Sequence, residues 1–170
     1  MYCGDETAAI IGDVGTIYSK FGFAGEDHPK CVIPSVVGLS GGDEPSHAGM
    51  EALLHRGASL PLGAPCAEGS GRLTNWDHVM RLWEHAVEHV LSSKVAEHPL
   101  LVCCNTAEPD AARAKYAELA FERLGPPALF LARNAMLSAF ASGRPTALVV
   151  DFGGGSTSVS PVVDGYVLRK

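Results

Sequence analysis

AIIGDVGT at residues 9–16 and ALVVDFGGGST at residues 147–157 follow one pattern. In each stretch an apolar run leads to an aspartate, and one further residue, glycine and small hydroxyl residues come after it. A short apolar run that ends in turn residues is typical of a buried strand entering a hairpin. Because the pattern occurs twice, near both ends of the chain, it predicts one site that the two turns build together.

The residues of these turns suit a phosphate group. Glycine lets the backbone approach a ligand closely, and successive amide N–H groups in such a turn form a concave anion site. Asp13 and Asp151 would repel phosphate, so we expect them to hold Mg²⁺, chiefly through water. Lys20 would reach phosphate oxygens as a point charge. The predicted phosphate contacts are Gly15, Thr16, Lys20, Gly153, Gly154, Gly155 and Ser156.

Length and composition limit the classes of protein that fit. The 170 residues suffice for one domain with its own core, and 46% hydrophobic against 19% charged residues indicates a globular chain. The formal charge of -6, without runs of lysine or arginine, argues against strong direct nucleic-acid binding. We expect no secretory signal, no membrane span and reduced cysteines, and therefore a cytosolic or nuclear protein.

Strands and helices alternate through the middle of the chain, and hairpins occupy both ends. We expect strands over residues 8–11, 16–23, 31–33, 100–104, 128–131, 146–150, 159–163 and 166–168. We expect helices over residues 110–124 and 134–141 and from residue 74 through residue 91, the last capped by Thr74 or Asn75. This order predicts an α/β domain with a mixed sheet flanked by helices.

Residues 39–72 differ from the rest. They are rich in Gly, Pro, Ser and Ala and have no sustained periodicity, so we expect a loop-rich insertion with one helical turn near residues 50–55. The segment is either a small inserted subdomain or a disordered loop.

A set of motifs, in order along the chain, resembles the actin family. DVGTIYSKFGFAG at residues 13–25 looks like the first phosphate loop of actins. The resemblance continues with IPSVVG at 33–38, LTNWD at 73–77, EHP at 97–99, ASGR at 141–144 and DFGGG at 151–155. Residues 151–170 are more similar to the nuclear actin-related proteins of SWI/SNF-like remodellers and NuA-type histone acetyltransferase complexes than to conventional actin.

The resemblance implies the N-terminal half of an actin-like ATPase (ribonuclease H-like) fold, with ATP or ADP and Mg²⁺ as ligands. It divides the chain into the first phosphate hairpin and start of the first domain (1–38), an insertion (39–72), the remainder of the first domain (73–145) and the second hairpin, which starts a second domain (146–170).

Three departures from conventional actin bear on hydrolysis. Ile17 stands where actin has glycine, and Gly154 replaces an acidic residue of the second loop. Asn134 stands where actin has a glutamine that positions the attacking water, and its side chain is one methylene shorter. A misplacement of about 1 Å at a reacting centre can cost about a hundredfold in rate. The resemblance therefore implies nucleotide binding with slow or absent hydrolysis. Asn134 would also cap the helix that it opens.

Two functions are compatible with these features. The first is an ATP-binding structural subunit of a nuclear chromatin-remodelling or acetyltransferase complex. Its partners would be actin, a helical segment of the remodeller ATPase or acetyltransferase subunits, and the nucleosome only indirectly. The alternative is a polymerising, actin-like ATPase of the cytoskeleton. The three departures, and the altered segment where actins carry a filament-contacting loop, favour the first.

One further motif is weighed against a structural explanation. HAVEH at residues 85–89 matches the H-x-x-E-H pattern of zinc enzymes. The actin resemblance runs through this helix without a metal, so we interpret the motif as a solvated helix face. Trp76 and Trp83 are interpreted as core or subunit contacts.

Overall fold

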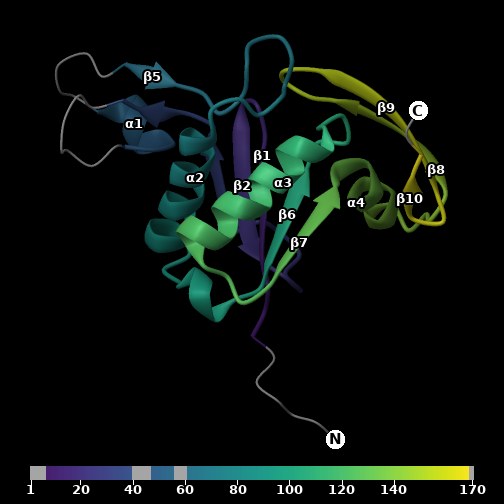
Figure 1. The fold of residues 1–170 in the computed structure, drawn as a ribbon, viewed down its shortest axis with the longest axis horizontal. Coiled ribbons are helices and arrows are strands. Elements are labelled where there is room, and N and C mark those ends of the chain that lie inside the picture. The colour runs from purple at the N-terminus through teal and green to yellow at the C-terminus, as the bar shows by residue number, and fades with distance from the viewer. Residues whose placement is uncertain (1–6, 40–46, 56–60, 169–170) are drawn as a thin grey trace, which may run out of the picture.

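The computed structural model describes residues 7–39, 47–55 and 61–168 (Figure 1). The strands are β1 (Ile10–Val14), β2 (Tyr18–Phe23), β3 (Cys31–Pro34), β4 (Val37–Gly38), β5 (Leu62–Gly63), β6 (Leu100–Cys104), β7 (Leu129–Arg133), β8 (Ala147–Phe152), β9 (Thr157–Val163) and β10 (Tyr166–Val167). The helices are α1 (Met50–Leu54), α2 (Trp76–His85), α3 (Asp110–Leu119) and α4 (Asn134–Ala141). Short turns of other helix types, Ala86–Val90, Val95–Glu97 and Ala120–Leu124, complete the list.

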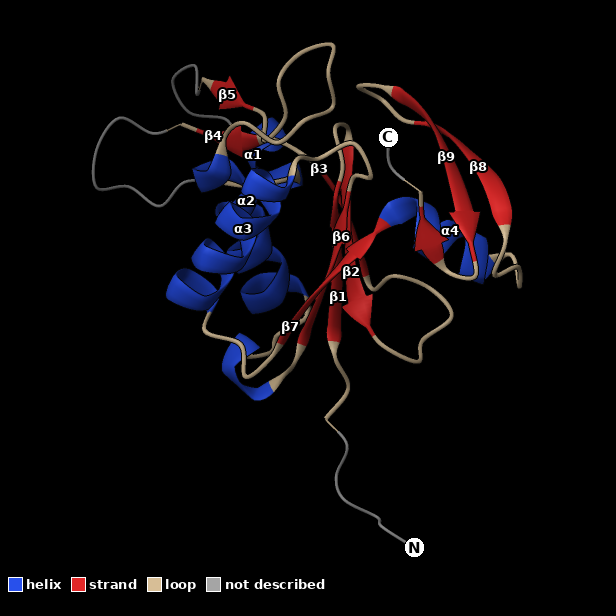
Figure 2. Cartoon of the chain, turned by 45° about the vertical axis from the view of Figure 1, so that its right-hand side comes forward, coloured by secondary structure: helices blue, strands red, loops and turns tan. Residues whose placement is uncertain are grey.

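The strands form a mixed sheet and two smaller antiparallel units. The five-stranded sheet has the order β3-β2-β1-β6-β7, in which β3, β2 and β1 are antiparallel and β1, β6 and β7 are parallel. The second sheet has the order β10-β9-β8, and β4 pairs with β5. Helices α2 and α3 lie together on one side of the five-stranded sheet, and α4 with β8 and β9 lies on the other (Figure 2). The predicted α/β class is confirmed.

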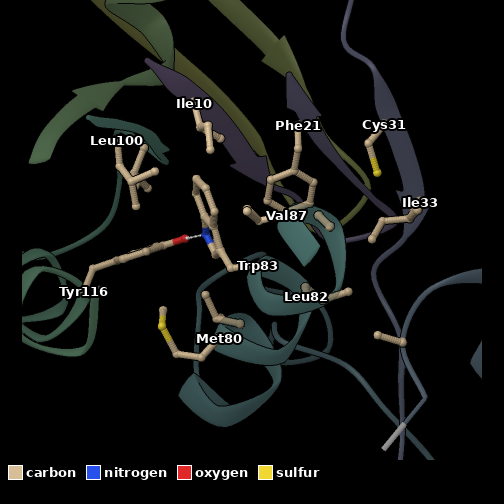
Figure 3. Packing of buried hydrophobic residues seen from close by; sticks show 14 of the residues in the cluster. Ile10, Phe21, Cys31, Ile33, Met80, Leu82, Trp83, Val87, Leu100 and Tyr116 are labelled. Carbon is tan, nitrogen blue, oxygen red and sulfur yellow. Dashed lines mark hydrogen bonds between the residues drawn. The ribbon is translucent and has the colours of Figure 1, made fainter. Parts of the chain in front are cut away.

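The main core is built around Trp83. Its side chain is fully buried, packs edge-on against Phe21 with ring centroids 4.9 Å apart, and donates from Nε1 to the hydroxyl of Tyr116 at 2.5 Å (Figure 3). Gly12 makes room for this ring, because a Cβ there would lie 2.3 Å from Trp83 Cη2 and Cζ2. Both tryptophans prove to be core residues, since Trp76 is partly buried against the same cluster.

Asn75, rather than Thr74, caps α2. Its side chain accepts a hydrogen bond from the backbone N–H of His78 at 3.2 Å, which satisfies one of the unpaired donors of the first turn.

The apolar face of α2 changes register where the helix widens. Val79, Met80, Trp83 and Val87 are fully buried, but Val90, which continues the same apolar spacing, is exposed. The N–H of Leu91 donates to the carbonyl of Ala86, five residues back, at 2.9 Å. One extra residue per turn rotates the following side chains, so Leu91 rather than Val90 packs against the core.

The segment over residues 39–72 has some regular structure. Helix α1 confirms the predicted helical turn, and the pairing of β5 with β4 was not predicted. Residues 40–46 and 56–60 of this segment lie outside the described residues, as do residues 1–6 with Cys3. The division into four segments stays a prediction. Within residues 7–39, 47–55 and 61–168, no helix combines the length and the apolar character that crossing a bilayer requires.

Candidate functional site

The sheet topology brings the two aspartate–glycine turns to one pocket. Strands β1, β6 and β7 are parallel, so their carboxyl ends meet at one edge of the sheet, where ligands of open α/β sheets commonly bind. The turn between β8 and β9 lies against this edge, and a pocket of about 510 Å³ opens between the two. Its lining includes every predicted site residue: Asp13, Gly15, Thr16, Lys20, Asn134, Asp151, Gly153, Gly154, Gly155 and Ser156. Their roles toward a ligand stay a prediction.

In the first turn, at residues 15–17, close packing leaves room only for glycine at position 15. A Cβ on Gly15 would lie 2.7 Å from the carbonyl oxygen of Tyr18, so the turn accommodates no side chain there. Across the β1–β2 pair, Asp13 lies opposite Lys20, and Lys20 Nζ is 3.5 Å from Asp13 Oδ2. This is a loose ion pair between partly exposed groups, so both charges remain accessible to a ligand in the pocket.

The second turn, at residues 153–156, offers backbone donors. The N–H of Gly153 donates to the carbonyl of Ser156 at 2.9 Å and closes the turn, so this amide is already engaged. Among the residues that the structure describes, no protein acceptor is bonded to the N–H of Gly154 or Gly155. The predicted anion site therefore rests on these two amides rather than on all the glycines of the turn.

The two turns touch each other and a third segment. A Cβ on Gly155 would lie 2.7 Å from Thr16 Oγ1 and 2.6 Å from the Cα of Gly71. A Cβ on Gly71 would in turn lie 2.9 Å from Ser156 Oγ. Glycines at these points let three backbones approach closely, so the hydroxyls of Thr16 and Ser156 converge on the same region.

Asn134 links the two halves of the site. Its Oδ1 accepts from the backbone N–H and the hydroxyl of Thr106 at 2.9 and 2.7 Å, and its Nδ2 donates to Asp151 Oδ2 at 3.1 Å. Arg133 occupies the N-cap position of α4, its side chain makes no capping hydrogen bond, and Asn134 is the first helical residue. The expected capping by Asn134 is thus replaced by a contact from its Oδ1 to the N–H of Ala135 at 2.9 Å.

Sequence reasoning missed several lining residues. They include Gly71, Cys103, Asn105 and Glu108. The last two follow β6, the parallel neighbour of β1, so the rule that parallel strands end at one sheet edge could have identified them. Glu108 is buried and accepts from the N–H of Leu73 at 2.9 Å, which ties the residues before α2 to the pocket.

Cys103 lies beside Asp13 on the neighbouring strand. Burial, and then the Asp13 carboxylate, raise the pKa of the Cys103 thiol above its ordinary value. The thiol therefore stays neutral and adds no negative charge to the pocket. Cys31, Cys66, Cys103 and Cys104 are free thiols, as expected for the part of the chain described.

The charges of the lining bear on which ligand fits. They comprise the carboxylates of Asp13, Glu108 and Asp151 and the ammonium of Lys20. A polyphosphate would meet net negative charge here, so a divalent cation is needed to screen it. The open amides and hydroxyls suit phosphate oxygens, and the paired aspartates suit a hydrated Mg²⁺, so the donor set fits a polyphosphate that carries Mg²⁺.

His85 and His89 lie outside this pocket's lining. Their ring centroids are 5.2 Å apart, and His85 Nδ1 is 4.0 Å from Glu51 Oε2. Among the described residues, no three His, Cys, Asp or Glu side chains are grouped so that they could hold a metal ion.

The fold and this two-turn pocket define a class of protein. A model of the Actin family matches residues 4–170, and the chain belongs to the actin family. It is 39% identical to Actin-related protein 4 of Arabidopsis thaliana, with 100% of this chain and 45% of that protein covered. It is 38% identical to Actin-related protein 4 of Schizosaccharomyces pombe, covering 99% and 38%.

A further relative carries a more specific name. The chain is 30% identical to the "SWI/SNF and RSC complexes subunit arp42" of Schizosaccharomyces pombe, with 98% of this chain and 39% of that protein covered. The resemblance to actin-related proteins is thus confirmed, and the chain spans less than half the length of these relatives.

Proposed function

We propose that the chain binds ATP or ADP with Mg²⁺ and serves as a structural subunit of a nuclear chromatin-remodelling or histone acetyltransferase complex. One observation carries the nucleotide part: two aspartate–glycine turns, distant in sequence, line one pocket. The complex part is supported by similarity to proteins named actin-related protein 4 and to a named SWI/SNF and RSC subunit.

Each residue has a definite part in this proposal. The amides of Gly154 and Gly155, the hydroxyls of Thr16 and Ser156, and Lys20 would bind phosphate oxygens. Asp13 and Asp151 would orient the water shell of Mg²⁺, which neutralises phosphate charge when bound.

Slow or absent hydrolysis follows from how Asn134 is held. Its oxygen accepts from Thr106 and its nitrogen donates to Asp151. A side chain held from both ends keeps Asp151 in place, and it is not free to turn toward a water molecule. We therefore assign Asn134 the role of a positioning residue for Asp151, and we expect it not to orient the attacking water as the glutamine of conventional actin is implied to do.

The partners in this proposal are actin and helical subunits of the complex, including a helical segment of the remodeller ATPase. Contact with the nucleosome would be indirect, because a chain of formal charge -6 offers no broad basic surface. Co-elution with actin and such a helical segment in gel filtration tests this part, and separate elution of all three would count against it.

The nucleotide retained by the chain tests the proposed function. After incubation with ATP and Mg²⁺ and removal of free nucleotide, we expect the retained nucleotide to remain ATP. Phosphate release that rises with protein concentration, together with sedimentable polymer, would instead support a polymerising cytoskeletal ATPase.

A further inference from the structure

Ile17 and Gly154 meet where the two turns approach each other. A Cβ placed on Gly154 would lie 2.5 Å from both Cδ1 and Cγ1 of Ile17, closer than real Cβ atoms come to other heavy atoms. The isoleucine side chain therefore lies against the Cα of Gly154 and takes the space that a side chain there would need. Because isoleucine is branched at Cβ, its χ1 angle is restricted, so moving Cγ1 away from Gly154 requires a change of rotamer.

This contact joins two features that looked independent in the sequence. The first turn has a large aliphatic residue, and the second turn has no side chain at the facing position. Ile17 is 56% exposed, so less than half of its surface is covered, and the contact with Gly154 contributes to that coverage. Burial of apolar surface stabilises the contact without any ligand.

The charges of the pocket oppose such an approach. Asp13 and Asp151 belong to different turns and line the same pocket, so their like charges repel each other. Lys20 Nζ, 3.5 Å from Asp13 Oδ2, offsets part of this repulsion. The Ile17–Gly154 contact offsets this repulsion, and neither charge nor nucleotide is needed to form it.

We propose that Ile17 is a positioning residue that holds the two phosphate turns at their closed spacing before nucleotide binds. The proposal rests on the proposed nucleotide function. A site whose competent form is already populated keeps its full intrinsic affinity, whereas an opened site loses affinity in proportion to the closed fraction. Removing about half of an isoleucine's burial lowers the closing equilibrium constant about fivefold, so the affinity for nucleotide falls by up to about fivefold.

Methyl NMR tests the contact directly. The isoleucines of the chain are Ile10, Ile11, Ile17 and Ile33, so δ1-methyl labelling gives a simple spectrum. Without nucleotide we expect a nuclear Overhauser effect between the Ile17 δ1 methyl and the Gly154 Hα protons. Absence of this signal in the folded chain would overturn the proposal.

A double-mutant cycle tests the functional part. We expect Ile17→Ala and Gly154→Ala each to weaken ATP binding by up to about fivefold, and the double variant to lose no more than either one. Ile17→Val is expected to retain most of the affinity, and Leu148→Ala, at an exposed aliphatic residue of β8, to retain all of it. Losses that multiply in the double variant would refute the coupling.

Failure of the proposed function would be recognised separately. If the unaltered chain binds no nucleotide, the same cycle is measured by urea unfolding. If the effects of the two substitutions on the free energy of unfolding are coupled and the methyl signal is present, the contact would still be shown to hold the two turns together. Additive effects would reject it.

Discussion

Tyr116→Phe removes one hydroxyl group from the centre of the core. Trp83 Nε1 donates to this hydroxyl at 2.5 Å, and the two side chains are 0% and 2% exposed. Phenylalanine preserves the ring and its edge-on contact with Trp76, whose centroid lies 5.7 Å away. The substitution therefore isolates the hydrogen bond and leaves the indole N–H without an acceptor where water cannot reach it.

The expected cost follows from that stranded donor. A buried donor that loses its acceptor costs about 1–3 kcal/mol, so we expect the free energy of unfolding to fall by about 2 kcal/mol. For a chain of this length, 1 kcal/mol corresponds to about 2–4 °C in Tm. The variant is therefore expected to melt about 4–8 °C lower.

Thermal unfolding followed by near-ultraviolet circular dichroism measures this change. Tyr166→Phe is the matched control, because it makes the same chemical change at a side chain that is 77% exposed, and we expect it to leave Tm unchanged. Equal shifts in both variants, or no shift for Tyr116→Phe, would refute the role of the buried hydrogen bond.

Gly12→Ala is expected to destabilise the chain by about 3 kcal/mol in urea unfolding, because its Cβ would lie 2.3 Å from the ring of Trp83. Burial lowers the pKa of His85 below its ordinary 6.5. The contribution of His85 to the free energy of unfolding is therefore present above pH 6.5 and is lost as pH falls, because the unfolded chain takes up the proton first. His85→Gln should flatten this loss in urea unfolding between about pH 7.5 and about pH 5.5, and an unchanged slope would contradict the assignment. Burial raises the pKa of Cys104 to about 11, so mass mapping should show its thiol unmodified by iodoacetamide in the native chain and modified after unfolding.

The convergence of Asp13 and Asp151 could be predicted from sequence because it depends on backbone patterns. A short apolar run followed by Asp-x-Gly specifies a strand and a tight turn, and the repetition of that pattern indicates a shared site. Helix α4 was likewise found at its predicted residues, since its start and its end before Gly143 are local signals.

Other features depend on contacts that no local signal records. Gly71 reaches the pocket from a loop far from both turns, and β4 and β5 are too short to show alternation. The widened turn after Ala86 altered which residue faces the core because a single shifted hydrogen bond rotates all that follows.

Which residues line the site was easier to predict from sequence than the contacts that they make within it. Asn134 was expected in the pocket, but its bonds to Thr106 and Asp151 depend on rotamers and on the loop after β6. Likewise Ile17 and Gly154 were each recognised as unusual, and only the structure places them against each other.

Isothermal titration calorimetry with ATP tests the paired-turn site most directly. It would compare the unaltered chain, with and without Mg²⁺, with the double variant Asp13→Ala, Asp151→Ala and with the control Asp27→Ala, at an exposed residue outside the pocket lining. We expect magnesium-dependent binding that is lost in the double variant and kept in the control. Binding that survives the double substitution or the removal of Mg²⁺, or no binding by the folded, unaltered chain, would contradict the account.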